Sequence, residues 1–150
     1  MKYWLIKSEA NCYSVNDLKK DKKTSWSGIR NYQARNFLKD MRVGDLAIFY
    51  HSGGNPPSAV GIAKVSMSAH PDLTAQDKAD EHYDPKSIQE NPIWQMVEFS
   101  YVETFKNPLT LQQIKINPEL DGIMLAQQGS RLSVQPVSKE HFEIIRKLGK

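Results

Sequence analysis

Hydrophobic residues alternate with polar ones, or form short apolar runs, in five segments of the chain, and such segments predict β-strands. Residues 46–50 (LAIFY) are apolar throughout, which predicts a strand in the middle of a sheet. Residues 94–105 alternate clearly and predict the longest strand. Glycine at position 61 predicts a close approach of another segment. The predicted strands are residues 3–8, 46–50, 59–67, 94–105 and 131–137.

Four other segments have a helical period of apolar residues, and three of these follow a capping residue. Ser14 and Asp17 form the pattern of a capping box, and Thr110 and Ser138 predict the starts of two later helices. Residues 30–41 predict a helix with an apolar stripe on one side and a basic stripe on the other. Residues 19–23 predict a polar connection that leads to Trp26.

The order of these elements predicts an α+β fold. The five strands cannot all be joined by βαβ crossovers, so we expect a small curved or barrel-like sheet flanked by helices. The chain has 150 residues, without repeats or linkers, and predicts a single domain over residues 1–150. Residues 70–91 show little periodicity and predict a long excursion between two strands.

Composition excludes several classes of protein. No run of about 18 apolar residues is present, so we expect no membrane span. Cys12 is the only cysteine, which excludes an internal disulfide. Phosphate-loop motifs are missing, and the histidines lack metal-ligand spacing, so we expect neither a cofactor nor a metal. A cytoplasmic protein is expected, associated with the nucleoid in a bacterium or with the nucleus in a eukaryote.

The charge distribution favours a polyanionic partner more than the net charge of +3 does. The first fifty residues are rich in lysine and arginine, whereas residues 72–90 are acidic. Such asymmetry predicts one positive face, although an ordinary solvated surface explains it equally well. The residues that we expect to bind backbone phosphates are Arg30, Arg35, Lys39 and Arg42.

Trp26 lies in the segment SWSG, where no neighbouring residue in the sequence is large enough to cover its ring. Two interpretations carry equal weight: a stacking platform for a flat ring, and a core residue. Tyr32, Tyr50 and Trp94 are candidates for further aromatic walls, with a core position favoured for Trp94. The neutral donors and acceptors that suit a base edge are Ser8, Asn31 and Gln135, His51 suits either a base or a phosphate, and Lys7 is a further cation.

Catalytic interpretations have less support. Cys12 could act as a nucleophile with His51 as its base, and Glu9 could act as a general base after the first strand. An inert cysteine and an exposed carboxylate are the ordinary alternatives. A protein-interaction module that uses residues 72–90 is a third hypothesis.

Several long motifs resemble the EVE domain family: YWLIKSE (3–9), SWSGIRNYQARNFL (25–38), GDLAIFYHS (44–52), VGIAKV (60–65), YDPKS (83–87), ENPIWQMV (90–97) and RLSVQPV (131–137). The resemblance implies a PUA-like fold, which is a small curved mixed β-barrel of about five or six strands flanked by helices. The sequence departs from the family pattern at Ala10, where a proline is usual.

The resemblance also implies a function: non-enzymatic recognition of a modified nucleobase, with a modified cytosine in DNA the leading candidate and modified RNA the other. YTH relatives hold a methylated base in an aromatic cage, and ASCH relatives suggest the alternative of a hydrolase or nuclease. The residues that this implies for the base pocket are Lys7, Ser8, Trp26, Asn31, Tyr32, Tyr50, His51, Ser52, Trp94, Ser133 and Gln135.

Overall fold

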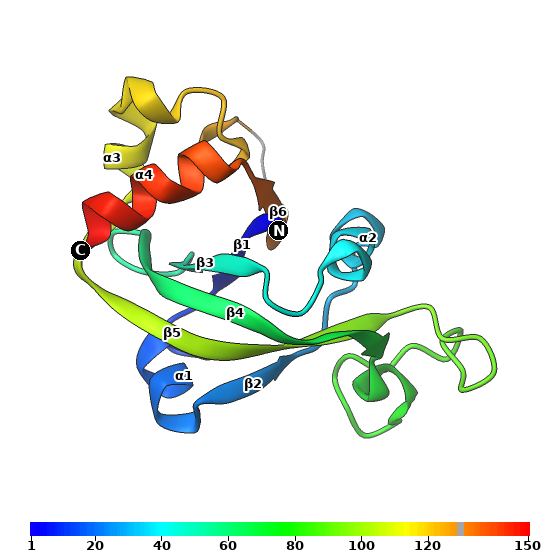
Figure 1. The fold of residues 1–150 in the computed structure, drawn as a ribbon. Coiled ribbons are helices and arrows are strands. Elements are labelled where there is room, and N and C mark those ends of the chain that lie inside the picture. Colours follow the sequence, from blue (N-terminus) through cyan, green and yellow to red (C-terminus); the bar gives the residue numbers. More distant parts are fainter. Residues whose placement is uncertain (129–130) are drawn as a thin grey trace.

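The computed structural model describes residues 1–128 and 131–150, and its centre is a mixed six-stranded sheet (Figure 1). The strand order is β2-β5-β4-β3-β1-β6, in which only the β1–β3 pair is parallel. The outermost strands, β2 and β6, do not pair with each other, so the sheet is curved but open. The strands are β1 (Tyr3–Ser8), β2 (Lys23–Trp26), β3 (Leu46–His51), β4 (Ser58–Pro71), β5 (Gln95–Thr110) and β6 (Val134–Val137).

The described residues also form four α-helices and three short 3₁₀ helices, of which α4 follows the last strand and the others lie between strands. Most α-helices begin where the sequence predicts. The Ser14–Asp17 capping box is present, and Thr110 and Ser138 cap the helices that follow them. Asn31 caps the second helix, which begins at Tyr32, two positions later than the predicted start. The helices are α1 (Val15–Asp21), α2 (Tyr32–Asp40), α3 (Leu111–Ile116), α4 (Lys139–Gly149), η1 (Leu73–Gln76), η2 (Pro118–Leu120) and η3 (Met124–Ala126).

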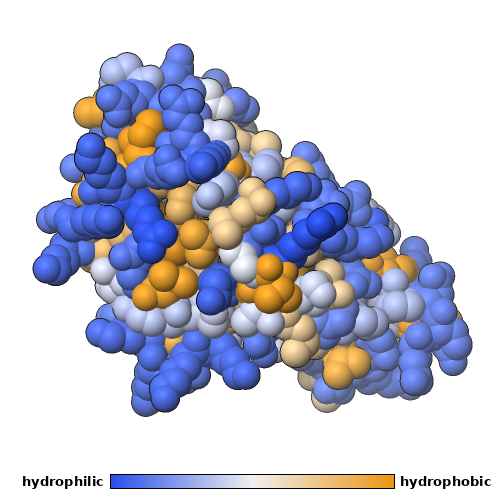
Figure 2. All heavy atoms as spheres, viewed as in Figure 1, coloured by the Kyte–Doolittle hydropathy of each residue, from blue (hydrophilic) through white to orange (hydrophobic). Residues whose placement is uncertain are grey.

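Alternation along the strands separates two hydrophobic cores, one on each face of the sheet. Trp4 and Ile6 of β1 face the core shared with α1 and α2, whereas Leu5 faces the core shared with α4. Figure 1 shows α4 and α1 on opposite sides of the strands. The surface seen in Figure 2 is mostly hydrophilic, and hydrophobic atoms gather over the middle of the molecule, where α4 meets the strands.

The structure differs from the sequence prediction at β2 and at β4. The polar residues of β2 form a strand rather than a connection, because Lys23 to Trp26 pair with Ser100 to Val97 of β5. Strand β4 continues to Pro71, so the excursion starts later than predicted. The close approach predicted at Gly61 is confirmed, because a Cβ atom there would collide with the carbonyl oxygen of Glu103.

Candidate nucleic-acid interface

A pocket of about 470 Å³ opens where β1, the loop before α1 and β2 meet. This volume lies within the range of small-molecule sites, roughly 300–1,000 Å³. Three of the predicted pocket residues line it, namely Lys7, Ser8 and Trp26. The other lining residues are Cys12, Tyr13, Thr24, Ser25, Ser27, Ile29 and His82, which we did not single out as base-pocket residues from the sequence.

Trp26 belongs to the core and to the pocket wall at once. Its side chain is 8% exposed, and its ring lies nearly perpendicular to those of Phe49 and Phe99, at centroid distances of 5.7 and 5.6 Å. Residues distant in the sequence thus cover most of the ring, which agrees with the core interpretation, while the rest of the residue lines the pocket. Its indole N–H has no hydrogen-bond partner among the described residues, and none of their buried side-chain nitrogens lacks one, so solvent reaches this N–H.

Lys7 and Ser8 end β1 and bring polar groups to the pocket. The Ser8 hydroxyl donates to the carbonyl oxygen of Tyr13 at 2.7 Å, which leaves its own oxygen free to accept. Lys7 forms no ion pair within the described residues, and burial lowers the pKa of its ammonium group. None of the lining residues is acidic. The pocket therefore offers a cation and hydroxyl groups, without a carboxylate to oppose an electron-rich ligand.

The last wall comes from residues 72–94, which join β4 to β5 and are called the 72–94 segment below. Asp72 anchors this segment, since its buried carboxylate accepts from the backbone N–H of Gly28 at 2.8 Å and from Arg30 at 3.0 Å. Burial alone would raise the pKa of Asp72, but its hydrogen bonds to Thr74, Gly28 and Arg30 hold the pKa below its usual value.

Gly28 allows His82 to reach the pocket. Its φ of +79° lies in the left-handed region, and a Cβ atom there would be only 3.0 Å from the His82 ring. Arg30 donates to the carbonyl oxygen of His82 at 2.7 Å, which fixes the backbone of the segment at the same point. His82 therefore lines the pocket although it lies more than fifty residues from Trp26 in the sequence.

The structure does not bring several predicted base contacts to this pocket. Tyr50 is 2% exposed and lies in the core on the opposite face of the sheet, where burial raises its pKa to about 12. Asn31 accepts from the N–H of Ala34 as the cap of α2. Gln135 is buried and donates to the carbonyl oxygen of Leu132.

Three more of the residues predicted to contact the base support the end of β1 instead of lining the pocket. His51 accepts from the backbone N–H of Val15 through Nε2 at 3.1 Å, and burial lowers its pKa. Backbone groups of Ser52 and Ser133 pair with those of Ser8 and Lys7. These contacts hold the end of β1 in place, but the side chains of His51, Ser52 and Ser133 do not line the pocket.

Tyr32 and Trp94 form a separate aromatic pair outside the pocket. Their ring centroids are 4.9 Å apart, and the rings are tilted by 34°. Trp94 is 5% exposed, in agreement with the core position favoured for it, and its indole N–H donates to Asp84 at 2.7 Å. The pKa of the Asp84 carboxyl is lowered, and this hydrogen bond is the largest cause.

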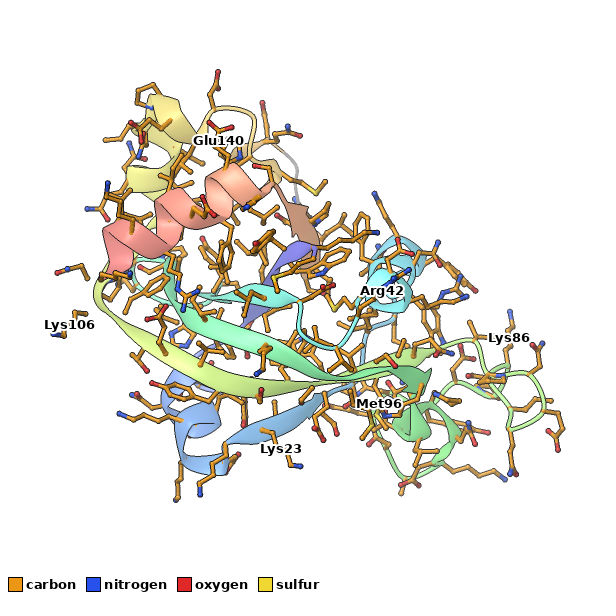
Figure 3. All side chains as sticks on the ribbon, viewed as in Figure 1. Lys23, Arg42, Lys86, Met96, Lys106 and Glu140 are labelled. Carbon is orange, nitrogen blue, oxygen red and sulfur yellow. The ribbon has the colours of Figure 1, made fainter. Side chains whose placement is uncertain are left out.

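The four predicted phosphate-binding residues divide into two groups. Arg30 makes five hydrogen bonds inside the protein, so its guanidinium has no donor left and the prediction of a phosphate contact is wrong. Arg35, Lys39 and Arg42 lie on or just after α2, and the last two are exposed. Figure 3 shows Arg42 beside α2 on the same side of the molecule as Lys86, whereas Lys106 lies at the opposite end.

The catalytic interpretations find no geometric support. Cys12 contacts Glu9, with 3.7 Å between Sγ and Oε2, whereas Nε2 of His51 is occupied by Val15. Within residues 1–128 and 131–150, no group of three or more histidine, cysteine, aspartate or glutamate side chains is placed to hold a metal ion. No helix in the same residues is long and apolar enough to cross a membrane.

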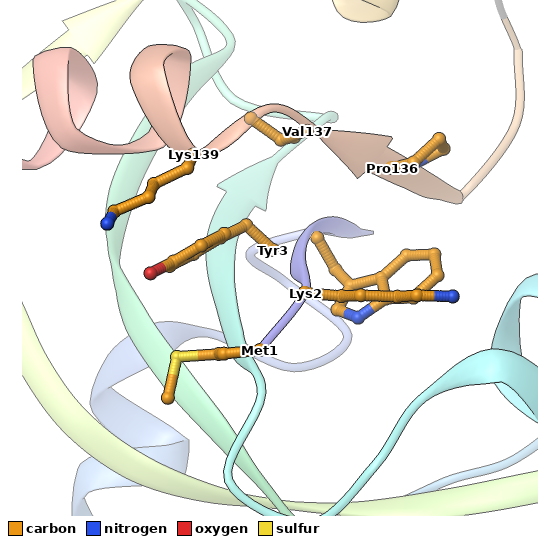
Figure 4. Close-up of a pocket in the computed structure, with 7 residues that line it drawn as sticks. Met1, Lys2, Tyr3, Pro136, Val137 and Lys139 are labelled. Atoms are coloured by element: carbon orange, nitrogen blue, oxygen red, sulfur yellow. The ribbon is translucent and has the colours of Figure 1, made fainter.

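A second pocket, of about 400 Å³, lies at the start of β1 (Figure 4). Lys2, Tyr3 and Lys139 line it together with Pro136 and Val137 of β6. It contains none of the predicted site residues, and the indole N–H of Trp4 beside it already donates to Asp45 at 3.1 Å. We therefore place the candidate interface at the Trp26 pocket.

The fold is that of a PUA-like domain, and the comparisons with known proteins agree with this fold. The family model of the EVE domain matches residues 2–148. The chain belongs to the EVE domain family.

Its relatives include thymocyte nuclear protein 1 from Gallus gallus. The two are 40% identical over an alignment 164 residues long, which covers 97% of this chain and 68% of the relative. A crystal structure of a protein from Pseudomonas syringae is 42% identical, with a TM-score of 0.94 and 99% of each chain covered. The human THYN1 protein, solved in complex with DNA that contains 5-methylcytosine, is 36% identical, with a TM-score of 0.92 and coverage of 100% and 98%.

An ASCH protein from Zymomonas mobilis has a TM-score of 0.56 at 11% identity over 99% of this chain and 97% of that one. Its likeness concerns the fold alone.

Proposed function

We propose that this protein is a non-enzymatic module that binds DNA containing a modified cytosine and holds that base, turned out of the helix, in the Trp26 pocket. The observation that carries the proposal is the pocket itself, whose wall combines an indole with a cation and hydroxyl groups. The human THYN1 protein, an EVE relative, has been solved with DNA that contains 5-methylcytosine, which supports cytosine as the base. Modified RNA is the other ligand that we test.

Each pocket group has a role that follows from its chemistry. Trp26 provides apolar surface for the flat base, and stacking of a base on an aromatic side chain contributes about 1–3 kcal/mol. Cytosine carries ring and carbonyl acceptors, which suit the Lys7 ammonium group. Its exocyclic amino group is a donor, which suits the free lone pairs of Ser8.

Contacts with the DNA backbone would come from Arg35 and Lys39 on α2 and from Arg42 just after it. The exposed residues Lys39 and Arg42 can neutralise phosphates, and the binding energy should then depend on salt through counterion release. Turning a base out of the stack costs a few kcal/mol, so these contacts and the pocket together must exceed that cost.

The test is a binding titration with short DNA and RNA oligonucleotides that carry a central cytosine, 5-methylcytosine, 5-hydroxymethylcytosine or N6-methyladenine. We expect tighter binding of one modified cytosine in DNA, with the preference reduced in Lys7→Gln and in Trp26→Phe. Lys106→Gln is the matched charge control, because Lys106 lies at the opposite end of the molecule.

Equal binding of all bases by the native protein would contradict the proposal. An RNA preference would move the ligand to modified RNA. Conversion of a modified nucleoside to product, detected by mass spectrometry and lost in Glu9→Ala, would favour an enzyme instead.

A further inference from the structure

Tyr32 is an exposed aromatic residue in a stack of two aromatic rings that lie between two guanidinium groups. Its side chain is 59% exposed although its ring lies against the buried ring of Trp94. The guanidinium of Arg30 lies 5.5 Å from the Trp94 ring centroid, and that of Arg35 lies 5.0 Å from the Tyr32 ring centroid. The stack thus runs from the interior to the surface and ends in Tyr32 and Arg35.

Hydrogen bonds fix the orientation of the three remaining members of this stack, Arg30, Trp94 and Arg35. Arg30 is held by five hydrogen bonds and Trp94 by its bond to Asp84. Arg35 donates to the side chain of Asn36 at 2.9 Å and to the carbonyl oxygen of Ile93 at 3.2 Å. A surface that is already ordered loses little entropy when a ligand binds to it.

The charge of the stack favours an anionic ligand. Arg30 is neutralised by Asp72, but Arg35 forms no ion pair within the described residues. The first turn of α2 contains no acidic residue. An unpaired guanidinium beside an exposed aromatic ring matches a nucleotide, which has a flat base and a negative phosphate.

The stack lies close to the Trp26 pocket. Ile29 lines the pocket, and Tyr32 follows three residues later. Their Cα atoms are therefore at most about 11 Å apart. Arg30 also joins the two sites, since it contacts both the pocket residue His82 and Trp94. The nucleotide next to a flipped one is joined to it through a single phosphate, so we expect it at the rim of the pocket, on the side where Tyr32 lies.

We propose that Tyr32 and Arg35 form a second nucleotide site, in which the base next to the flipped base stacks on Tyr32 and its phosphate binds Arg35. This inference rests on the proposed function, because the pocket sets the position of the bound strand. It assigns Tyr32 to the neighbouring base rather than to the modified base.

The test combines a variant of Tyr32 with a change in the DNA. Native protein and Tyr32→Ala are titrated with oligonucleotides that carry the preferred modified base, in which each neighbouring nucleotide in turn is intact or abasic. For the native protein we expect one abasic neighbour to weaken binding roughly 5- to 150-fold, the range for loss of one stacked base. Tyr32→Ala should bind the intact oligonucleotide as weakly as the native protein binds the abasic one. The same abasic change should not weaken binding by the variant any further.

Three controls separate stacking from other effects. Tyr32→Phe keeps the ring and should bind as the native protein does. Tyr83→Ala removes another surface tyrosine, 36% exposed, which is not part of the stack and should leave the abasic response unchanged. Thermal unfolding of each variant identifies any loss of folded protein, and Tyr32→Ser replaces Tyr32→Ala if the latter is unfolded.

The outcomes for the two sites are distinguishable. Equal abasic responses in native protein and Tyr32→Ala would overturn the second site. The ratio of affinities for modified and unmodified bases tests the pocket instead, and it should be the same in Tyr32→Ala as in the native protein. A native ratio of one would overturn the proposed function, whereas the coupling between Tyr32 and the neighbouring nucleotide would still be measured with the same oligonucleotides.

Discussion

At the residue scale, Trp26 shows how one side chain can serve stability and recognition together. Its contacts with Phe49 and Phe99 come from β3 and β5, and its remaining surface borders the pocket. Edge-to-face aromatic pairs contribute about 0.5–1.5 kcal/mol each beyond the burial of area. Loss of binding after a drastic substitution of Trp26 would therefore reflect unfolding as well as loss of a contact.

The first prediction separates these two effects. We expect Trp26→Ala to lower the free energy of unfolding by about 3–5 kcal/mol, because it leaves a cavity in the core. Trp26→Phe should lower it much less, while still reducing the preference for the modified base. Denaturant unfolding measures both values. If Trp26→Ala were as stable as the native protein, the ring would not be a core residue.

The second prediction concerns the protonation of His51. Its Nε2 accepts from Val15 only when that nitrogen is unprotonated, and burial lowers its pKa below 6.5. The unfolded chain therefore takes up the proton at a higher pH than the folded protein does. The free energy of unfolding should be highest above about pH 6.5 and should decrease as the pH falls through the range between the two pKa values.

Stability measured from pH 7.5 to 5 in native protein and His51→Gln checks this expectation. The variant should lose that part of the pH dependence. Identical pH profiles would mean that His51 does not titrate differently in the two states.

At the element scale, the 72–94 segment depends on a few buried polar contacts. Asp72 holds it to Gly28 and Arg30, and Arg30 in turn holds the backbone at His82. The segment contains a single 3₁₀ helix, η1, and is otherwise irregular, so these contacts substitute for the ladder of a strand. One pocket wall is therefore only as firm as this anchor.

The third prediction tests the anchor. Asp72→Ala leaves the partly buried guanidinium of Arg30 without its carboxylate, and breaking a buried pair costs about 3–5 kcal/mol. We expect backbone amides of residues 73–93 to exchange hydrogen faster, with less effect on β1 and β3. Asp77→Ala is the control, because Asp77 is exposed in the same segment. Unchanged exchange in Asp72→Ala would show that other contacts hold the segment.

Which elements can be predicted depends on how local their determinants are. The helices α1, α3 and α4 were predictable because the capping residues Ser14, Thr110 and Ser138 lie beside the turns that they cap. Strand β2 was not, since its polar sequence becomes a strand only by pairing with β5.

The same distinction applies to the candidate site. Lys7, Ser8 and Trp26 were identified from their motifs, and all three line the pocket. The apolar run LAIFY gives no alternation from which to place Tyr50, which faces the other core. His82 comes to the pocket through Gly28 and Arg30, contacts that no local pattern marks, although the positive-φ glycine in SWSG was a signal for a close approach.

At the scale of the whole molecule, the net charge of +3 hides an uneven distribution. Arg42 lies beside α2 on one side of the molecule, and Lys106 lies at the opposite end (Figure 3). If DNA contacts α2 as we propose, Arg42 contributes to binding and Lys106 does not.

The fourth prediction follows from this difference. In a plot of the logarithm of the DNA binding constant against that of the salt concentration, Arg42→Gln should reduce the slope by about 0.9 for duplex DNA, the value for one phosphate contact. Lys106→Gln should leave the slope unchanged. Titrations at four or more salt concentrations measure it. Equal slopes in native protein and Arg42→Gln would remove Arg42 from the interface.

The positions of the three tryptophans give the protein a built-in optical probe. The indole groups of Trp4 and Trp94 donate to the carboxylates of Asp45 and Asp84, respectively. The indole N–H of Trp26 has no such partner among the described residues, and Trp26 lines the pocket, which is open to solvent. A base that enters the pocket replaces this solvent, so Trp26 fluorescence should change in intensity and wavelength when the base binds. Unlabelled DNA can then be titrated directly, and the tryptophan that reports on occupancy is also the one that we propose makes the contact.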